Sequence, residues 1–170
     1  VLELNCIMTL NANIIIWTTT PWTLPSNQAV SLNGEFEYAL VQCDIGQGTE
    51  ILVVASEMVA GIMSRYGCTD FKVLGKSSGE SLENMPLQHP FLERHVPMIL
   101  GDHVTTDAGT GAVHTAPDHG VDDFNVGREY GLGTLNLVDE NGIFTSAAGK
   151  FAGAHVYKVD EQVLETLKQE

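Results

Sequence analysis

Basic residues are scarce in this sequence. Its 170 residues include 8 Lys and Arg against 22 Asp and Glu, which gives a formal net charge of -14. Affinity for nucleic acids comes largely from the neutralisation of phosphates by basic side chains, so this chain alone should bind RNA poorly. If it acts on an RNA-linked substrate, most of the grip on the RNA must come from elsewhere. The charge therefore favours a part of a larger protein.

Cysteines and long apolar runs are also lacking. Cys6, Cys43 and Cys68 are odd in number and contain no Cys-x-x-Cys spacing, which argues against a disulfide framework and a thiolate zinc site. The uninterrupted apolar stretch Ile14 to Trp17 is far too short for a membrane span or a signal core. We expect a soluble protein of the reducing cytoplasm.

Several motifs of covalent and phosphate chemistry are missing. The sequence has no Gly-x-Ser-x-Gly elbow and no His-Glu-x-x-His helix, and Cys43 lies in an expected buried strand, so no nucleophile is evident. Gly75-Lys76-Ser77-Ser78 lacks the glycine spacing of a P-loop. We interpret residues 75–84 as a solvated surface loop. No cofactor is expected.

The composition is that of an ordinary folded protein. Apolar residues make up 44% and charged residues 18%, with 17 Gly and 6 Pro, which is typical of a globular domain with many turns. A chain of this length can bury a core without disulfides or metals. We expect residues 1–170 to form a single domain. Because the chain starts at Val1 without Met, we also expect an excised or processed piece of a longer protein.

Strand patterns alternate with a few helical ones. Branched and aromatic residues predict strands, whereas helical spacing of apolar residues with flanking Ser or Gly predicts helices. The expected strands are 14–18, 38–43, 51–55, 97–100, 103–105, 112–115 and 135–138, and the expected helices are 56–67, 121–130 and 159–168. We predict a mixed α+β, β-rich fold, a mostly antiparallel β-barrel with peripheral helices.

Two short stretches carry the chemistry. Residues 17–27, Trp-Thr-Thr-Thr-Pro-Trp-Thr-Leu-Pro-Ser-Asn, form a hydroxyl-rich turn with two prolines. Residues 109–124 bring His114, His119, Asp122 and Asp123 onto a glycine-containing loop that enters a helix. A helix N-terminus favours ionised carboxylates. Such an anion beside hydroxyls suits a ligand with an ammonium group and neighbouring hydroxyls. For Asp122 we favour helix capping over a ligand role, whereas for Asp123 we favour a ligand role.

A metal site is an alternative interpretation of the second stretch. Imidazole and carboxylate groups suit zinc and other divalent ions. However, His114 and His119 lie on a loop interrupted by Pro117 and Gly120, and no third nitrogen or sulfur ligand is evident nearby. We therefore assign no metal ligand. The remaining histidines, His89, His95, His103 and His155, are interpreted as ordinary core or loop residues.

The two stretches together resemble the editing insertion of bacterial isoleucyl-tRNA synthetases, class I enzymes. The similarity rests on Thr-Thr-Thr-Pro-Trp-Thr-Leu-Pro at 18–25 with Asn27, and on Gly-Thr-Gly-Ala-Val-His-Thr-Ala-Pro at 109–117 before Asp123. It spans nearly the whole chain. Related valyl and leucyl insertions typically have Thr-Thr-Arg-Pro and lack a histidine at the position of His114. Asp118 stands where the family often has Gly or Ala.

The resemblance implies an aminoacyl-tRNA deacylase module. It would hydrolyse valine wrongly attached to isoleucine tRNA, with valyl-adenylate as a second candidate substrate, in a ligase whose ATP-dependent site lies in another domain. Discrimination of one methylene is worth only roughly 1 to 3 kcal/mol, for which the isoleucine-versus-valine problem is the standard example, so a second sieve is needed. The His-Ile-Gly-His and Lys-Met-Ser-Lys-Ser motifs of class I synthesis are absent. Partners would be the 3' terminal adenosine of mischarged tRNA, valine or valyl-adenylate, and the remainder of the synthetase.

Residue roles follow from the same resemblance. Asp123 would hold the valine ammonium group, and His114 would border the side chain and exclude isoleucine. Thr19 and Thr20 are assigned to catalysis with Asp123, because their hydroxyls would position the attacking water. The other substrate-binding candidates are Trp17, Thr18, Trp22, Thr23 and Asn27. No general base is evident, so rate would arise from orientation and electrostatics. Alternatives are a valyl- or leucyl-type insert, an inactive insert that positions the tRNA end, and a free-standing metallohydrolase.

Overall fold

The computed structural model describes residues 12–46 and 48–169, which form strands, α-helices and short 3-10 helices. The strands are β1 (Asn13–Ile14), β2 (Ala29–Leu32), β3 (Glu37–Asp44), β4 (Thr49–Ala55), β5 (Phe71–Ser78), β6 (Pro86–Gln88), β7 (His95–Leu100) and β8 (Ala112–Thr115). The α-helices are α1 (Val59–Arg65), α2 (Val121–Glu129) and α3 (Asp160–Gln169). The 3-10 helices are η2 (Pro21–Ser26), η3 (Ser56–Met58), η4 (Glu80–Leu82), η5 (Ser146–Phe151) and η6 (Val156–Lys158).

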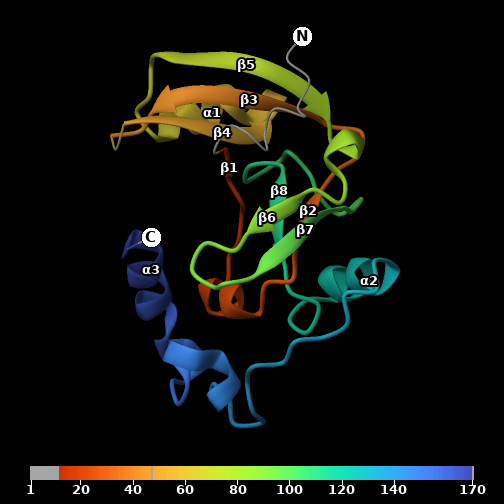
Figure 1. The fold of residues 1–170 in the computed structure, drawn as a ribbon, viewed down its shortest axis with the longest axis vertical. Coiled ribbons are helices and arrows are strands. Elements are labelled where there is room, and N and C mark those ends of the chain that lie inside the picture. The colour runs from red at the N-terminus through yellow and green to blue at the C-terminus, as the bar shows by residue number, and fades with distance from the viewer. Residues whose placement is uncertain (1–11, 47, 170) are drawn as a thin grey trace. The chain divides into compact units, whose positions relative to one another are not determined.

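The strands form two four-stranded sheets, with the orders β1-β4-β3-β5 and β6-β7-β2-β8 (Figure 1). In the first sheet β3 pairs antiparallel with both β4 and β5, whereas β1 pairs parallel with β4. The expected mixed α+β class is confirmed. The described strands close into no barrel, so the barrel expectation is not confirmed. Alternating apolar residues set which strand faces are buried, but they do not determine whether a sheet closes.

The described residues divide into two compact units. We call the described parts of 12–17, 31–84 and 99–113 the first unit, and those of 18–30, 85–98 and 114–169 the second unit. Strands β2, β7 and β8 each have residues in both units. The expectation of a single domain stays a prediction.

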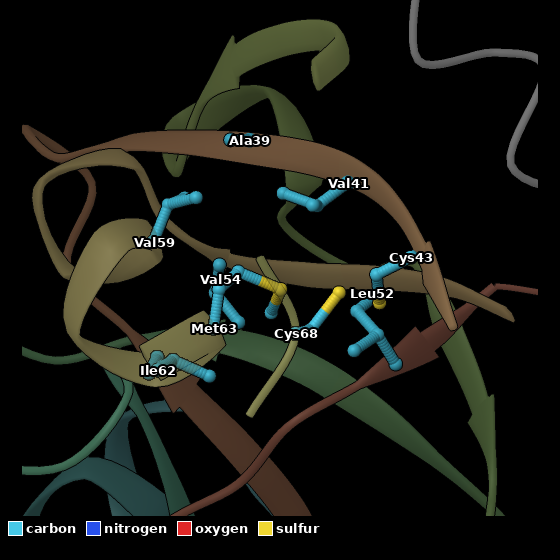
Figure 2. Close-up of a cluster of buried hydrophobic side chains, with 9 residues drawn as sticks. All are labelled: Ala39, Val41, Cys43, Leu52, Val54, Val59, Ile62, Met63 and Cys68. Atoms are coloured by element: carbon cyan, nitrogen blue, oxygen red, sulfur yellow. The ribbon is translucent and has the colours of Figure 1, made fainter. Parts of the chain in front are cut away.

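The core of the first unit lies between its sheet and helix α1 (Figure 2). Strands β3 and β4 place every second side chain on the face toward α1, as the two-residue period of a strand requires. The cluster comprises Ala39, Val41, Cys43, Leu52, Val54, Val59, Ile62, Met63 and Cys68. Helical spacing of apolar residues predicted helix α1, and its Val59, Ile62 and Met63 are buried, whereas the following Tyr66 is 45% exposed. Cys43 and Cys68 are free thiols, and Cys6 lies outside the described residues.

Strand β5 corrects the interpretation of residues 75–84 as a solvated loop. Gly75 and the three residues after it belong to β5, and residues 80–82 form η4. β5 is the edge strand of its sheet and most of its side chains are exposed. An exposed edge strand tolerates Lys, Ser and Gly, so its composition looks like that of a loop. Backbone pairing with β3 supplies its structure.

Two glycines bring the 109–111 loop against the first sheet. The Ala55 N–H donates to the Thr110 carbonyl oxygen across 3.0 Å, and the Tyr38 hydroxyl donates to the Gly111 carbonyl oxygen. Gly109 and Gly111 have φ of 86° and 78°, which favours glycine. A Cβ at Gly111 would collide with the Ala55 side chain. Burial raises the pKa of Tyr38 to about 12, so this phenol remains a donor.

The second unit holds the predicted C-terminal helices. Helix α2 begins after Gly120, carries Asp122 and Asp123 in its first turn, and is followed by Gly131 with φ of 63°. This matches the predicted helix at 121–130. Helix α3 contacts η2. Its buried face comprises Val163 and Thr166, while Leu164 is 46% exposed.

Two predicted strands are wrong, and of a third, 14–18, only Ile14 lies in a strand, β1, while Trp17 forms an isolated bridge to Val113. Residues 103–105 lie in a turn after β7, and within 135–138 only Val138 forms an isolated bridge, to Phe144. Both are short branched stretches beside Gly or Asn, where turn preferences override strand preference. Across the two described ranges, no helix has the length and apolarity needed to cross a bilayer.

Candidate functional site

The predicted hydroxyl-rich turn forms the 3-10 helix η2 and the residues just before it. Pro21 starts η2, as its fixed φ allows at a first helical position, and Pro25 lies inside it. The Thr20 N–H donates to the Thr18 hydroxyl across 3.1 Å, and the hydroxyls of Thr19 and Thr20 lie 3.3 Å apart. Thr19 is exposed and Thr18 and Thr20 are partly exposed. These three hydroxyls are therefore accessible.

Thr23 and Asn27 are different, because they face the buried His114. The Thr23 Oγ1 lies 2.9 Å from Nε2 of His114, and the Asn27 Nδ2 lies 2.7 Å from its Nδ1. Thr23, Asn27 and His114 are 4%, 5% and 6% exposed. The structure thus brings together residues from the two sequence motifs. Thr23 and Asn27, which we expect to bind substrate, both contact the histidine.

The hydrogen bonds fix the protonation of His114. An amide nitrogen can only donate, so Asn27 donates to Nδ1 and the ring proton lies on Nε2. Thr23 donates its hydroxyl proton to the Thr20 carbonyl oxygen across 2.8 Å and can accept from that Nε2–H. Burial, with His89 and His119 nearby, lowers the pKa of His114 to about 4. His114 is therefore neutral, with both nitrogens occupied, and presents no free base.

Asp123 occupies the first turn of α2 at partial exposure. Its Oδ2 accepts a hydrogen bond from the Ala116 N–H across 2.7 Å, which joins the helix to the loop after β8. A Cβ at Gly120 would come within 3.1 Å of its Oδ1, so glycine leaves space beside this carboxylate. The helix N-terminus favours the carboxylate here.

His119 connects this carboxylate region with Trp22. The two rings meet edge to face with centroids 4.9 Å apart. Burial lowers the pKa of His119, while the charges of Asp118 and Asp123 oppose that shift. Its buried Nε2 has no hydrogen-bond partner among residues 12–46 and 48–169. Trp22 is partly buried and packs on His119.

Trp17 belongs to the first unit, where it is 40% exposed. Its backbone N–H donates to the Ala112 carbonyl oxygen across 2.8 Å. Its ring lies against Gly109, where an added Cβ would come within 2.8 Å of the ring. The other eight predicted site residues all lie in the second unit.

Two residues that sequence reasoning missed also contact η2. His89 Nε2 lies 3.0 Å from the Leu24 carbonyl oxygen, and Arg94 Nη2 donates to the Pro25 carbonyl oxygen across 2.8 Å. Neither belongs to a recognisable motif, and His89 is 65 residues away from Leu24. No signal in the sequence could have found them.

The metal alternative finds no support in the geometry. Within the described ranges, no three His, Cys, Asp or Glu side chains lie together as a metal would require. The arrangement offers instead accessible hydroxyls, a neutral imidazole and a carboxylate, which suit a ligand with an ammonium group and polar oxygens.

The chain is similar in sequence to a segment of isoleucine–tRNA ligases. It is 63% identical over 157 residues to that of Marinomonas sp. (strain MWYL1) and 56% identical over 156 residues to that of Teredinibacter turnerae, each over 92% of this chain. It spans only 17% and 16% of these relatives. No family model matches the chain.

The fold is similar to solved editing domains. The GlLeuRS-CP1 crystal structure superposes with a TM-score of 0.71 at 18% identity, covering 92% of this chain and 80% of that one. The P. knowlesi cytosolic leucyl-tRNA synthetase editing domain gives a TM-score of 0.71 at 11% identity, covering 92% and 82%. At these identities the similarity concerns the fold.

Proposed function

Because the chain is an isoleucine–tRNA ligase homologue with the fold of class I synthetase editing (CP1) domains, we propose that it hydrolyses valine wrongly esterified to isoleucine tRNA. The observation that carries the proposal is the buried Thr23–His114–Asn27 network. It holds a neutral ring in the same unit as the accessible threonine hydroxyls and Asp123.

Asp123 would bind the ammonium group of the misattached amino acid. Its carboxylate is held by the Ala116 N–H on one oxygen, at a helix N-terminus that favours negative charge. A charge-assisted hydrogen bond between ammonium and carboxylate is about twice as strong as a neutral one. This contact would fix the orientation of the amino acid without reading its side chain.

His114 would border the amino-acid side chain and exclude isoleucine. Its two nitrogens are occupied by Thr23 and Asn27, so the ring offers an uncharged surface of fixed orientation. A mobile surface can rearrange to accommodate an added methylene group. A rigid surface cannot, so it rejects the larger side chain more strongly. Valine would be accepted and isoleucine refused.

The chemistry would be direct attack by water on the ester carbonyl carbon. The carbon–oxygen bond to the terminal ribose breaks, valine leaves as the acid, and the ribose oxygen takes a proton that originates from water. Thr19 and Thr20, with backbone groups and the free ribose hydroxyl, would position that water. Neutral His114 has no free lone pair for this proton, so the rate would come from orientation and electrostatics.

The remaining assignments belong to the same proposal. Thr18 would contact the terminal adenosine or the ester, and Trp22 would help to shape the site. The site would lie in a cytoplasmic ligase whose remaining domains supply the grip on tRNA, consistent with a net charge of -14. Valyl-adenylate is a second possible substrate of the same chemistry.

A ligand titration tests the proposal. The chain is titrated with a non-hydrolysable valyl-aminoadenosine and with its isoleucyl counterpart, and amide shifts are followed in the wild type and in Asp123→Asn. We expect shifts near Asp123 and His114 with the valyl ligand alone, and their loss in Asp123→Asn. An exposed carboxylate variant, Asp122→Asn, is the matched control on the same helix turn. Equal binding of both ligands, or none, would favour an inactive insert that positions the tRNA end.

A further inference from the structure

Three consecutive residues of η2 each take a hydrogen bond from a distant part of the second unit. Thr23 lies against His114 Nε2 at 2.9 Å, the Leu24 carbonyl oxygen against His89 Nε2 at 3.0 Å, and the Pro25 carbonyl oxygen against Arg94 Nη2 at 2.8 Å. His89 and Arg94 lie on the same short segment, between β6 and β7. The segment 89–94 therefore binds the two residues of η2 that directly follow Thr23, which itself contacts His114.

His89 is built for this contact. A carbonyl oxygen can only accept, so the His89 proton lies on Nε2, and Nδ1 accepts from the Phe91 N–H across 3.3 Å. The side chain is 2% exposed, and its ring meets Phe91 edge to face with centroids 4.6 Å apart. Both nitrogens are occupied and the ring is locked by packing. Its contact with Leu24 is thus a fixed point.

Arg94 adds a second fixed point. Its guanidinium keeps a planar set of donors, and it satisfies the carbonyl of Pro25, a residue inside η2. The segment that carries both residues is itself tied down, because the His89 N–H donates to the Arg94 carbonyl oxygen across 2.9 Å. A backbone-closed loop thus presents two donors to two successive carbonyls.

We propose that His89 and Arg94 are positioning residues for hydrolysis, which set η2 so that the Thr23 hydroxyl meets His114 and the preceding threonines meet the substrate. The catalytic part of this inference rests on the proposed function. The structural part does not, because it concerns only the Thr23–His114 contact. Displacing catalytic groups by about 1 Å can lower a rate on the order of a hundredfold.

Paired variants separate the hydrogen bonds from general stability. His89→Gln keeps a donor at the position of Nε2, whereas His89→Leu removes it; Arg94→Lys keeps a charged donor, whereas Arg94→Met keeps only the stem. His95→Leu is the control, because His95 is exposed and begins β7 in the same segment. The first measurement is the solvent exchange rate of the His114 Nε2–H, observed by nitrogen-15 NMR of the whole chain.

In His89→Leu and Arg94→Met we expect this proton to exchange at least about tenfold faster, because the local opening of η2 becomes easier. His89→Gln, Arg94→Lys and His95→Leu should remain close to the wild type. Unchanged exchange in both His89→Leu and Arg94→Met overturns the proposal. If His89→Leu does not fold, Arg94→Met, which removes no buried ring, decides the matter alone.

The second measurement is deacylation of valyl-tRNA by the folded wild type and variants, each within the complete ligase, because the remaining domains would supply the grip on tRNA. We expect kcat to fall about tenfold or more in His89→Leu and Arg94→Met with KM nearly unchanged, and recovery in His89→Gln and Arg94→Lys. Equal losses in the conservative variants would overturn the positioning role. If the wild type itself hydrolyses no valyl ester, the proposed function fails, while the exchange measurement still judges the contact of η2 with His114.

Discussion

The side-chain amide of Asn27 donates a hydrogen bond to Nδ1 of His114 across 2.7 Å, and this contact fixes the single ring proton on Nε2. The same amide nitrogen lies 2.7 Å from the Ala29 carbonyl oxygen, so its orientation admits no exchange of nitrogen and oxygen. His114 is thereby a neutral, oriented ring. Its chemistry is decided by a residue 87 positions earlier in the chain.

Asn27→Asp should reverse this arrangement. A carboxylate at this position cannot donate to Nδ1 and instead accepts from a protonated ring, so we expect the pKa of His114 to rise from about 4 by roughly 2 to 3 units. Nitrogen-15 shifts of the imidazole followed against pH measure the change. The exposed Asn141→Asp is the control. An unchanged pKa of His114 in Asn27→Asp would mean that Asn27 does not determine the protonation of the His114 ring.

Thr23→Val should destabilise the chain while preserving its shape. The substitution removes the only acceptor described for the His114 Nε2–H within residues 12–46 and 48–169, and an unsatisfied buried donor costs roughly 1 to 3 kcal/mol. Urea unfolding measures the free energy of unfolding. Thr166→Val is the matched control, because Thr166 is 6% exposed and its hydroxyl only donates to the Gln162 carbonyl oxygen within α3. Equal losses in the two variants would argue against a special role for Thr23.

Stability should fall between neutral and mildly acidic pH. Burial lowers the pKa of His114 and that of His89 from 6.5 to about 4, so between these values the unfolded chain binds protons that the folded chain refuses. The free energy of unfolding is then highest above the unfolded value and decreases as pH falls toward 4. Nearby His119 and Arg94 carry or gain positive charge and oppose protonation in the same direction.

Urea unfolding at a series of pH values measures this dependence. For His114 the loss should be on the order of 3 kcal/mol over the full interval. His89→Gln, which does not titrate, should make the slope shallower, and Asn141→Gln, at an exposed position without a titratable group, is the control. A free energy of unfolding of the wild type that does not change between pH 6.5 and pH 4 would contradict the conclusion that His114 and His89 are buried and neutral.

Gly111→Ala tests the docking of the 109–111 loop in the first unit. Gly111 has φ of 78°, and an added Cβ would collide with Ala55, so we expect a loss of roughly 2 to 4 kcal/mol in the free energy of unfolding. Gly61→Ala is the control: it lies within α1 with open space at its Cβ position, and alanine there should stabilise by about 0.5 to 1 kcal/mol. If both variants behave alike, the loop is not held as described.

The motifs alone located most of the candidate site but not its internal order. Thr23, Asn27 and His114 belong to the two stretches singled out by their hydroxyls, prolines and histidine. Which of them face substrate and which support another residue depends on burial, and burial depends on tertiary packing. His89 and Arg94 show the limit, because their partners are backbone carbonyls, which every residue possesses.

The fold was predictable where one periodicity dominates. Strands β3 and β4 are runs of branched and aromatic residues, and helices α1 and α2 follow helical spacing, each with turn residues at its ends. The edge strand β5 was missed, since its exposed residues resemble those of a loop, and fully buried β2 was missed because Ala-Val-Ser-Leu is too short to show a period. Sheet order depends on pairings between distant segments, which no local pattern encodes.

His114→Ala should weaken the exclusion of isoleucine. Removing the ring leaves space where the proposed function places an added methylene, whose exclusion is worth roughly 1 to 3 kcal/mol. We therefore expect the ratio of valyl-tRNA to isoleucyl-tRNA deacylation, compared as kcat/KM, to fall by about ten- to a hundredfold. His95→Ala, at an exposed position of the same unit, is the control. Because Asn27 and Thr23 orient the ring, their variants should lower the same ratio, but by less than His114→Ala does. A ratio unchanged in His114→Ala would remove this side chain from the sieve, even if the chain still hydrolyses the valyl ester.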